Sequence, residues 1–140
     1  MDINAIIEHA AEVIRAIPAM ADQPVIEVHK GNVANALNIA IGKQRFAVLV
    51  GWNGFKAKSN SSKTIVGETS LAVDVFEKPL VNQENALHLL DAARLIANAV
   101  NLSQPPGQSP VVFREITSVA EPAPGIISTT VNFDVSNSTL

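Results

Sequence analysis

The run from Phe46 to Trp52 constrains the fold of this chain more than any other segment. Successive side chains of a strand point to opposite faces of a sheet, and a strand with no charge on either face is typical of a sheet interior covered on both sides. The run therefore predicts a central strand, and we expect Trp52, the only tryptophan, to pack in the core rather than at an interface. Its two uncharged sets are Phe46, Val48, Val50 and Trp52 on one side and Ala47, Leu49 and Gly51 on the other.

Three other segments show the three- and four-residue apolar spacing of amphipathic helices. The first covers residues 3–17, and the third and strongest covers residues 82–100 with Asn82 as its N-terminal cap. The second begins at Asn32, and we expect it to stop at Gly42, because glycine readily adopts the left-handed conformation that ends helices.

Further strands are predicted on both sides of the central one. Residues 25–29 form a short β-prone run after a proline, and residues 65–78 resume strand character and are expected to pair antiparallel with the central strand. Between them, residues 53–63 turn to Gly, Asn, Ser and Lys and predict a long, mobile hairpin loop.

The last third of the chain predicts a second hairpin. Residues 103–110 form a proline-rich linker, and residues 111–119 and 126–135 each read as strands joined by a turn at 120–125. Residues 136–140 are expected to form a flexible C-terminal tail.

Length and composition agree with a single core. The chain has 140 residues, 47% of them apolar and 16% charged, which is enough apolar surface to offset chain entropy within one domain. We therefore predict one α+β domain over residues 1–135, in which two or three helices cover a mostly antiparallel sheet.

The sequence carries no recognisable catalytic, cofactor or metal motif. With no cysteine there is no disulfide, thiolate nucleophile or sulfur-based zinc site. His9, His29 and His88 fall in three different predicted elements, without the HxH or HExxH spacing that places two ligands on one face. No GxSxG or SxxK motif marks a serine nucleophile. We therefore predict a protein that is not an enzyme and needs no cofactor.

Charge narrows the class of partner. The net charge is -3 and the ten Lys and Arg are scattered, so tight binding of duplex DNA is not expected. The acidic N-terminus and the lack of a long apolar run predict no signal peptide and no membrane span. One basic cluster falls within residues 53–63, and we predict an interaction loop there that consists of Asn53, Phe55, Lys56, Lys58 and Lys63.

Taken together, the order of elements resembles that of tail terminator proteins of long-tailed bacteriophages, especially those of Mu-like contractile phages. The residues that carry the resemblance are the opening helix Ile3 to Ile17, the strand Phe46 to Val50 running into Gly51-Trp52-Asn53-Gly54, the stretch Leu71 to Phe76, the helix segment Ala86 to Arg94 and the closing strand Ile127 to Val135.

The resemblance implies a structural function. Such a protein forms a ring, expected to be a hexamer, that stops polymerisation of the tail tube at its head-proximal end and docks the neck. Its expected partners are copies of itself, tail tube and sheath proteins, and neck or connector proteins, while DNA passes through the lumen without specific binding. The expected location is the virion tail or neck, and the host cytoplasm during assembly.

Two other readings stay open at this point. One is a head-tail connector or adaptor of the same particle. The other, from a different class, is a small ligand-binding or enzymatic α+β domain with a site built from scattered Asp, His and Ser residues. A deep pocket that holds His29 or His88 beside a carboxylate would favour this last reading.

Overall fold

A computed structural model describes residues 3–59, 63–79 and 87–140 of the chain. Three α-helices, one short 3-10 helix and six strands lie within these ranges. In chain order they are α1 (Ile3–Arg15), η1 (Pro18–Met20), β1 (Val25–Glu27), α2 (Val33–Gln44), β2 (Phe46–Ser59), β3 (Val66–Glu77), α3 (Leu89–Val100), β4 (Val111–Ile116), β5 (Ala120–Ala123) and β6 (Ile126–Thr139).

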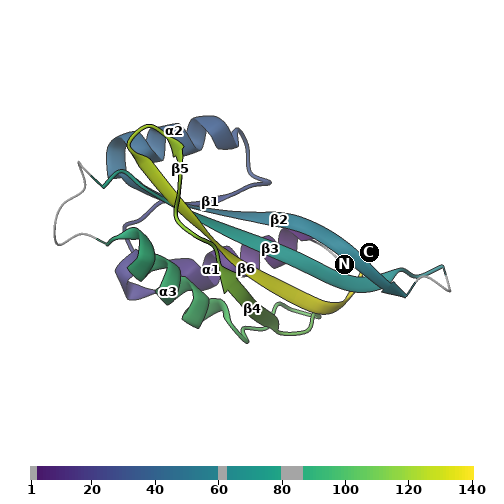
Figure 1. The fold of residues 1–140 in the computed structure, drawn as a ribbon. Helices are drawn as coiled ribbons and strands as arrows, with labels where there is room; N and C mark the ends of the chain where they lie inside the picture. The colour runs from purple at the N-terminus through teal and green to yellow at the C-terminus, as the bar shows by residue number, and fades with distance from the viewer. Residues whose placement is uncertain (1–2, 60–62, 80–86) are drawn as a thin grey trace.

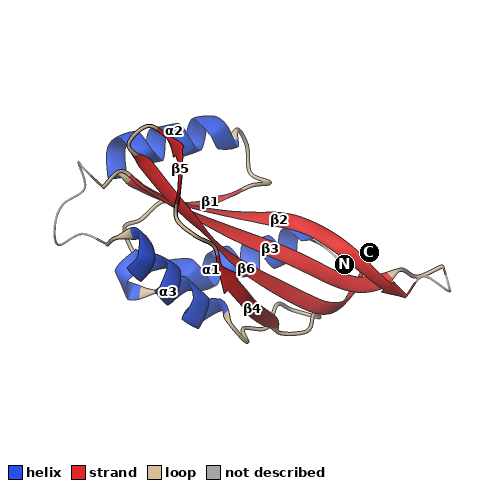
Figure 2. Cartoon of the chain, viewed as in Figure 1, coloured by secondary structure: helices blue, strands red, loops and turns tan. Residues whose placement is uncertain are grey.

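The six strands form one sheet in the order β1-β2-β3-β6-β4, and β5 also pairs with β6. The short β1 is parallel to β2, whereas all the other pairs are antiparallel. Helices α1 and α3 lie on one face of the sheet and α2 lies on the other (Figure 2). The predicted α+β fold, a mostly antiparallel sheet covered by helices, is therefore confirmed.

Strand β2 is covered on both faces, as its uncharged run predicts. Phe46, Val48 and Val50 are fully buried in the larger core cluster, together with α1 and α3. Ala47, on the opposite face, belongs to a smaller cluster built on α2. The smaller cluster consists of Ala40, Ile41 and Ala47 with the partly buried Ile26, Leu37, Phe76 and Ile126 around it.

Helix α2 begins as predicted but ends three residues later than expected. The side chain of Asn32 accepts a hydrogen bond from the backbone N–H of Asn35 and so caps the first turn. Gly42 lies inside the helix, and Arg45, with a φ of 58°, is the left-handed residue at its end. The prediction that Gly42 stops the helix is therefore wrong, because a non-glycine residue adopts the terminating conformation.

The predicted hairpin loop is instead a β-structure. Strand β2 continues to Ser59 and pairs with β3 as far as Val66, so the loop prediction is wrong for residues 53–59; residues 60–62 lie outside the described part. The two strands extend past the helices as an arm (Figure 1). We call β2 from Trp52 to Ser59, with the part of β3 that pairs with it, the arm.

The C-terminus belongs to the same structure. Strand β6 reaches Thr139, which pairs with Val66, and Leu140 donates its backbone N–H to the carbonyl of Ile65. The backbone pairing of residues 138–140 contradicts the predicted flexible tail at 136–140. Asn137, with a φ of 54°, lies where the β3–β6 register shifts, and asparagine tolerates this conformation better than most residues.

The remaining predictions for the C-terminal half are confirmed in part and wrong in part. Residues 103–110 form neither helix nor strand, as expected of a proline-rich segment. Residues 120–123, predicted as part of a turn, form β5, and the strand predicted to reach residue 119 ends at Ile116. The predicted cap Asn82 lies outside the described residues; in the structure His88 precedes the first turn of α3.

The two edges of the sheet differ. On the outer side of β4, Val111 bonds to Leu102 and Ser103, and Phe113 donates its backbone N–H to the side chain of Asn101 at 2.9 Å. At the other edge, β1 pairs only with residues 48–50 of β2. Among the described residues, nothing pairs with the outer side of β2 from Trp52 to Ser59.

Candidate interaction surfaces

The five residues of the predicted interaction loop lie in or beside the arm. Asn53, Lys56 and Lys58 are exposed on β2 and Phe55 is half-buried, while Lys63 is exposed between the two strands of the hairpin. The structure thus keeps them together but places four of them on a paired strand. The arm has close backbone contacts, because a Cβ at Gly67 would lie only 2.1 Å from the carbonyl oxygen of Lys56.

Trp52 is the main correction to the predicted core. Its side chain lies at the base of the arm and is 49% exposed, although we expected it inside the core. The even-numbered residues before it, Val48 and Val50, are fully buried on the helix side of β2. Trp52 follows them where the arm begins, and there the helices no longer cover the strand. The sequence alone does not show where this cover ends.

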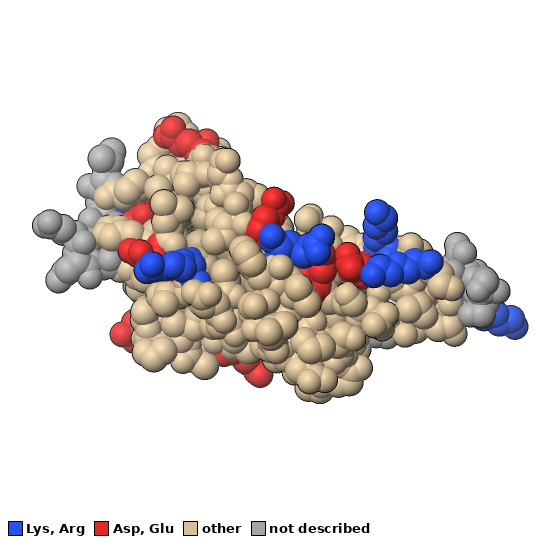
Figure 3. Space-filling model, turned by 60° about the horizontal axis from the view of Figure 1, so that its bottom comes forward, with Lys and Arg blue, Asp and Glu red and all other residues tan. Residues whose placement is uncertain are grey.

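A row of charged groups crosses the sheet near the arm. Lys58 on β2 pairs with Glu68 on β3 at 3.4 Å, and Arg114 on β4 pairs with Asp134 on β6 at 2.9 Å. Ser70 also donates to Asp134. Blue and red side chains lie close together toward the arm end of the molecule in Figure 3. Here oppositely charged side chains on neighbouring strands form ion pairs with one another. The row is therefore a solvent-facing part of the sheet whose charges are already paired.

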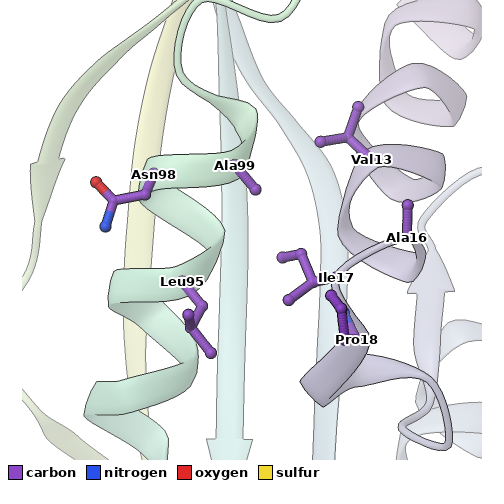
Figure 4. A pocket seen from close by; sticks show the side chains of 7 residues that line it. All are labelled: Val13, Ala16, Ile17, Pro18, Leu95, Asn98 and Ala99. Atoms are coloured by element: carbon purple, nitrogen blue, oxygen red, sulfur yellow. The ribbon is translucent and has the colours of Figure 1, made fainter.

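On the other side of the molecule, α1 and α3 enclose an apolar groove with a volume of about 500 Å³. Ile17 and Leu95 project into it from opposite walls, whereas Asn98 points away from it (Figure 4). No charged residue from the described part of the chain contributes to its walls. Its lining consists of Val13, Ala16, Ile17, Pro18, Leu95, Asn98 and Ala99.

The sequence offered a partial signal for this groove. Ile17 ends the apolar stripe of the first predicted helix, and Val13 is a further apolar residue of that segment. Both are only partly buried, because α1 ends at Arg15 and the chain turns into η1. Nothing in the sequence placed Leu95 opposite them, because that requires knowing how α1 and α3 pack.

A buried carboxylate anchors the edge of the sheet to α1. Glu27, whose side chain is 1% exposed, binds Arg15 at 2.9 Å, His29 at 3.1 Å and Lys30 at 3.2 Å. Burial alone raises the pKa of Glu27, but its hydrogen bonds with Arg15, His29 and Lys30 outweigh this and hold the pKa below its ordinary value. The carboxylate is therefore ionised and neutralised by its neighbours.

Oxygen and nitrogen ligands for a cation also meet at this point. Ligand atoms of Glu8, Glu27 and His29 all lie within 4.8 Å of one another, the one such group found among the described residues. Arg15 and Lys30 both bind the Oε2 of Glu27, however, and their positive charges would repel a divalent cation. The arrangement is that of an ion-pair cluster that holds α1 against β1.

A second buried carboxylate, Glu77, lies at the start of α3. One oxygen bonds to the Nδ1 of His88 and the other accepts the backbone N–H of Leu89 at 3.1 Å. A carboxylate at the N-terminus of a helix satisfies free backbone donors and interacts favourably with the helix dipole. Both groups line a cavity of about 230 Å³ that also includes Leu90, Asp91, Val119 and Ile127.

His9 completes the survey of histidines. Its ring lies 2.9 Å from the hydroxyl of Ser103 and joins α1 to the segment after α3. Burial lowers the pKa of His9, although the nearby Glu12 acts in the opposite direction. The three histidines thus lie in three separate places, as the sequence predicted.

No helix within the described ranges is long and apolar enough to cross a bilayer. The sequence matches no family model, and no curated protein is significantly similar to it.

Proposed function

We propose that the chain is a structural subunit of a phage tail, of the tail terminator type, which forms a ring at the head-proximal end of the tail tube, stops tube growth and docks the neck. In this function the chain catalyses no covalent reaction. Its proposed partners are copies of itself, the tube and sheath proteins and the neck.

One observation carries the proposal: two different surfaces lie at separate places on one body. The arm presents an open strand edge and an exposed tryptophan, and the groove between α1 and α3 presents apolar walls. Different surfaces on one subunit give head-to-tail contacts, which close into a ring when the rotation between subunits allows it.

The charge distribution agrees with this function. A ring around passing DNA must not grip the duplex, and the chain has a net charge of -3 with its charged face paired into ion pairs. The order of elements that resembles tail terminators is the second support.

The test uses particles that lack this protein. If it is a terminator, negative-stain images of those particles show tails of excessive and variable length, and supplying the intact chain restores normal length. Tails of normal length that fail to join heads contradict the terminator assignment and favour a connector or adaptor of the same particle.

A ligand-binding or enzymatic domain is the second candidate, because His88 lies beside the buried Glu77 in a cavity. Against it, both oxygens of Glu77 already bond to His88 and to the start of α3. The variant His88→Gln separates the two: tails of normal length and infectivity agree with the structural proposal, while normal assembly with lost infectivity favours chemistry at this cavity.

A further inference from the structure

The groove between α1 and α3 has the composition of an interface centre. The described residues in its walls carry no charge, and Ile17 and Leu95 face each other across it (Figure 4). The centres of protein–protein interfaces are likewise depleted in charge.

Acidic side chains border this groove. Glu12 is exposed one helical turn before Ala16, and Asp91 is exposed one turn before Leu95. The nearby basic groups are already used, since Arg15 pairs with Glu27 and Arg94 with Asp91. Glu12 has no ion pair with any described residue, so the border near α1 carries uncompensated negative charge.

The arm carries the opposite charge. Lys56 and Lys58 lie on its β2 strand and Lys63 follows in the hairpin, while its β3 strand adds one carboxylate, Glu68, so the arm is basic on balance. The rest of the chain holds seven of the ten Lys and Arg against twelve of the thirteen Asp and Glu. Within the described ranges Lys58 pairs with Glu68, but neither Lys56 nor Lys63 has an ion pair. A basic arm and an acidic remainder on one chain are complementary between two copies.

Trp52 supplies an apolar anchor at the base of this arm. It is half exposed, and exposed tryptophans that enter apolar pockets are the side chains that most often dominate binding energy. The arm lies at one end of the sheet, while α1 runs toward the other end before it reaches the groove (Figure 1). The arm can therefore reach the groove of a second copy more directly than it can reach the groove of its own chain.

We propose that the arm of one copy docks in the α1–α3 groove of a second copy, with Trp52 against the apolar walls and Lys56 near Glu12. This inference rests on the proposed function and names the surfaces that join neighbouring subunits. The contact is head-to-tail, because each copy donates its arm to one neighbour and receives the arm of another.

Trp52 is also the reporter, since the chain has one tryptophan and no tyrosine. Increasing the concentration of the full chain should shift its emission to shorter wavelength and protect it from acrylamide quenching, in step with the mass measured by light scattering. Trp52→Ala should weaken self-association at least roughly 30-fold. The matched control is Ile39→Ala, which removes an equally exposed apolar side chain from α2 and should leave association unchanged.

The groove and the charges are tested by separate variants. Ala16→Gln adds polar bulk to an exposed position just after α1 on the groove wall and should abolish association without affecting folding. Lys56→Glu should weaken association roughly tenfold, and adding Glu12→Lys in the same chain should restore it. The charge control, Lys43→Glu at the end of α2, should have no effect.

Two results would overturn this contact. One is association that proceeds with unchanged Trp52 emission and is indifferent to Ala16→Gln; the proposed ring then forms through other surfaces and the proposed function stands. The other is a chain that stays monomeric while tube protein alone shifts the Trp52 emission, which assigns the arm to that partner. Failure of the proposed function is a separate outcome, seen as normal tail length in particles without the protein.

Discussion

At the residue scale, the fold depends on two buried carboxylates that the sequence does not mark as special. Glu27 and Glu77 each point to the buried face of a strand, where the preceding residues on that face are apolar. Each is almost fully buried. Each is satisfied by groups from another element, so partners that lie apart in sequence decide whether burial is tolerated.

Replacing Glu27 by Gln is expected to cost about 2 kcal/mol of unfolding free energy at neutral pH, because three charged or polar groups lose an ionised acceptor. The folded pKa of Glu27 lies below its ordinary value, so its contribution is full above the unfolded pKa and is lost as pH falls through the folded pKa. Urea unfolding at a series of pH values measures both effects.

The control for this prediction is Asp22→Asn, which changes an exposed carboxylate and should alter stability by no more than about 0.5 kcal/mol. A loss in the Glu27→Gln variant that stays constant as the pH is lowered through the acid range would contradict the assigned linkage.

At the element scale, helix α2 contains a correctable weakness. Gly42 lies inside the helix, where glycine costs more conformational entropy than alanine, and no atom lies within 4 Å of the Cβ that alanine would add. Gly42→Ala should therefore raise the free energy of unfolding by about 0.5 to 1 kcal/mol, measured by urea denaturation.

A second glycine gives the opposite sign. At Gly67 the added Cβ would lie within 3 Å of backbone atoms of Lys56 and Ala57, which cannot move without disturbing the arm. Gly67→Ala should destabilise the protein. If Gly67→Ala left stability unchanged or raised it, the local packing described for the arm would be wrong.

The elements also show what the sequence could predict. The strand at Phe46–Val50 and the start of α2 at Asn32 follow from local patterns, because burial on both faces and helix capping leave clear signatures. The arm left no such signature. Its β2 strand is held by backbone pairing and has no buried residue from Trp52 to Ser59, so Asn53, Gly54 and Lys58 read as turn and solvent residues.

The candidate surfaces divide in the same way. Lys56, Lys58 and Lys63 form the one basic cluster in the sequence, and the structure gathers them at the arm. The groove and the exposure of Trp52 depend on where α1 ends and how it packs against α3. Both features depend on tertiary packing, which the residue pattern within a single segment does not predict.

At the scale of the whole molecule, self-association through a basic arm and an acidic groove border should depend on ionic strength. Raising the salt concentration should weaken association, because exposed charges are screened beyond the Debye length of about 8 to 10 Å. Sedimentation velocity at low and high salt measures the change. Association that strengthens with salt would instead indicate a contact in which apolar burial alone decides.

The unequal sheet edges set the direction in which the molecule can be extended. Asn101 and residues 102–103 occupy the backbone groups along the first half of β4, whereas the backbone of β2 from Trp52 onward has no partner on its outer side among the described residues. A strand from another molecule can therefore pair with the β2 edge, whereas the first half of the β4 edge is already occupied. This asymmetry opposes edge-to-edge stacking of copies into an endless ribbon and so acts against fibre formation in a protein with so much β-structure.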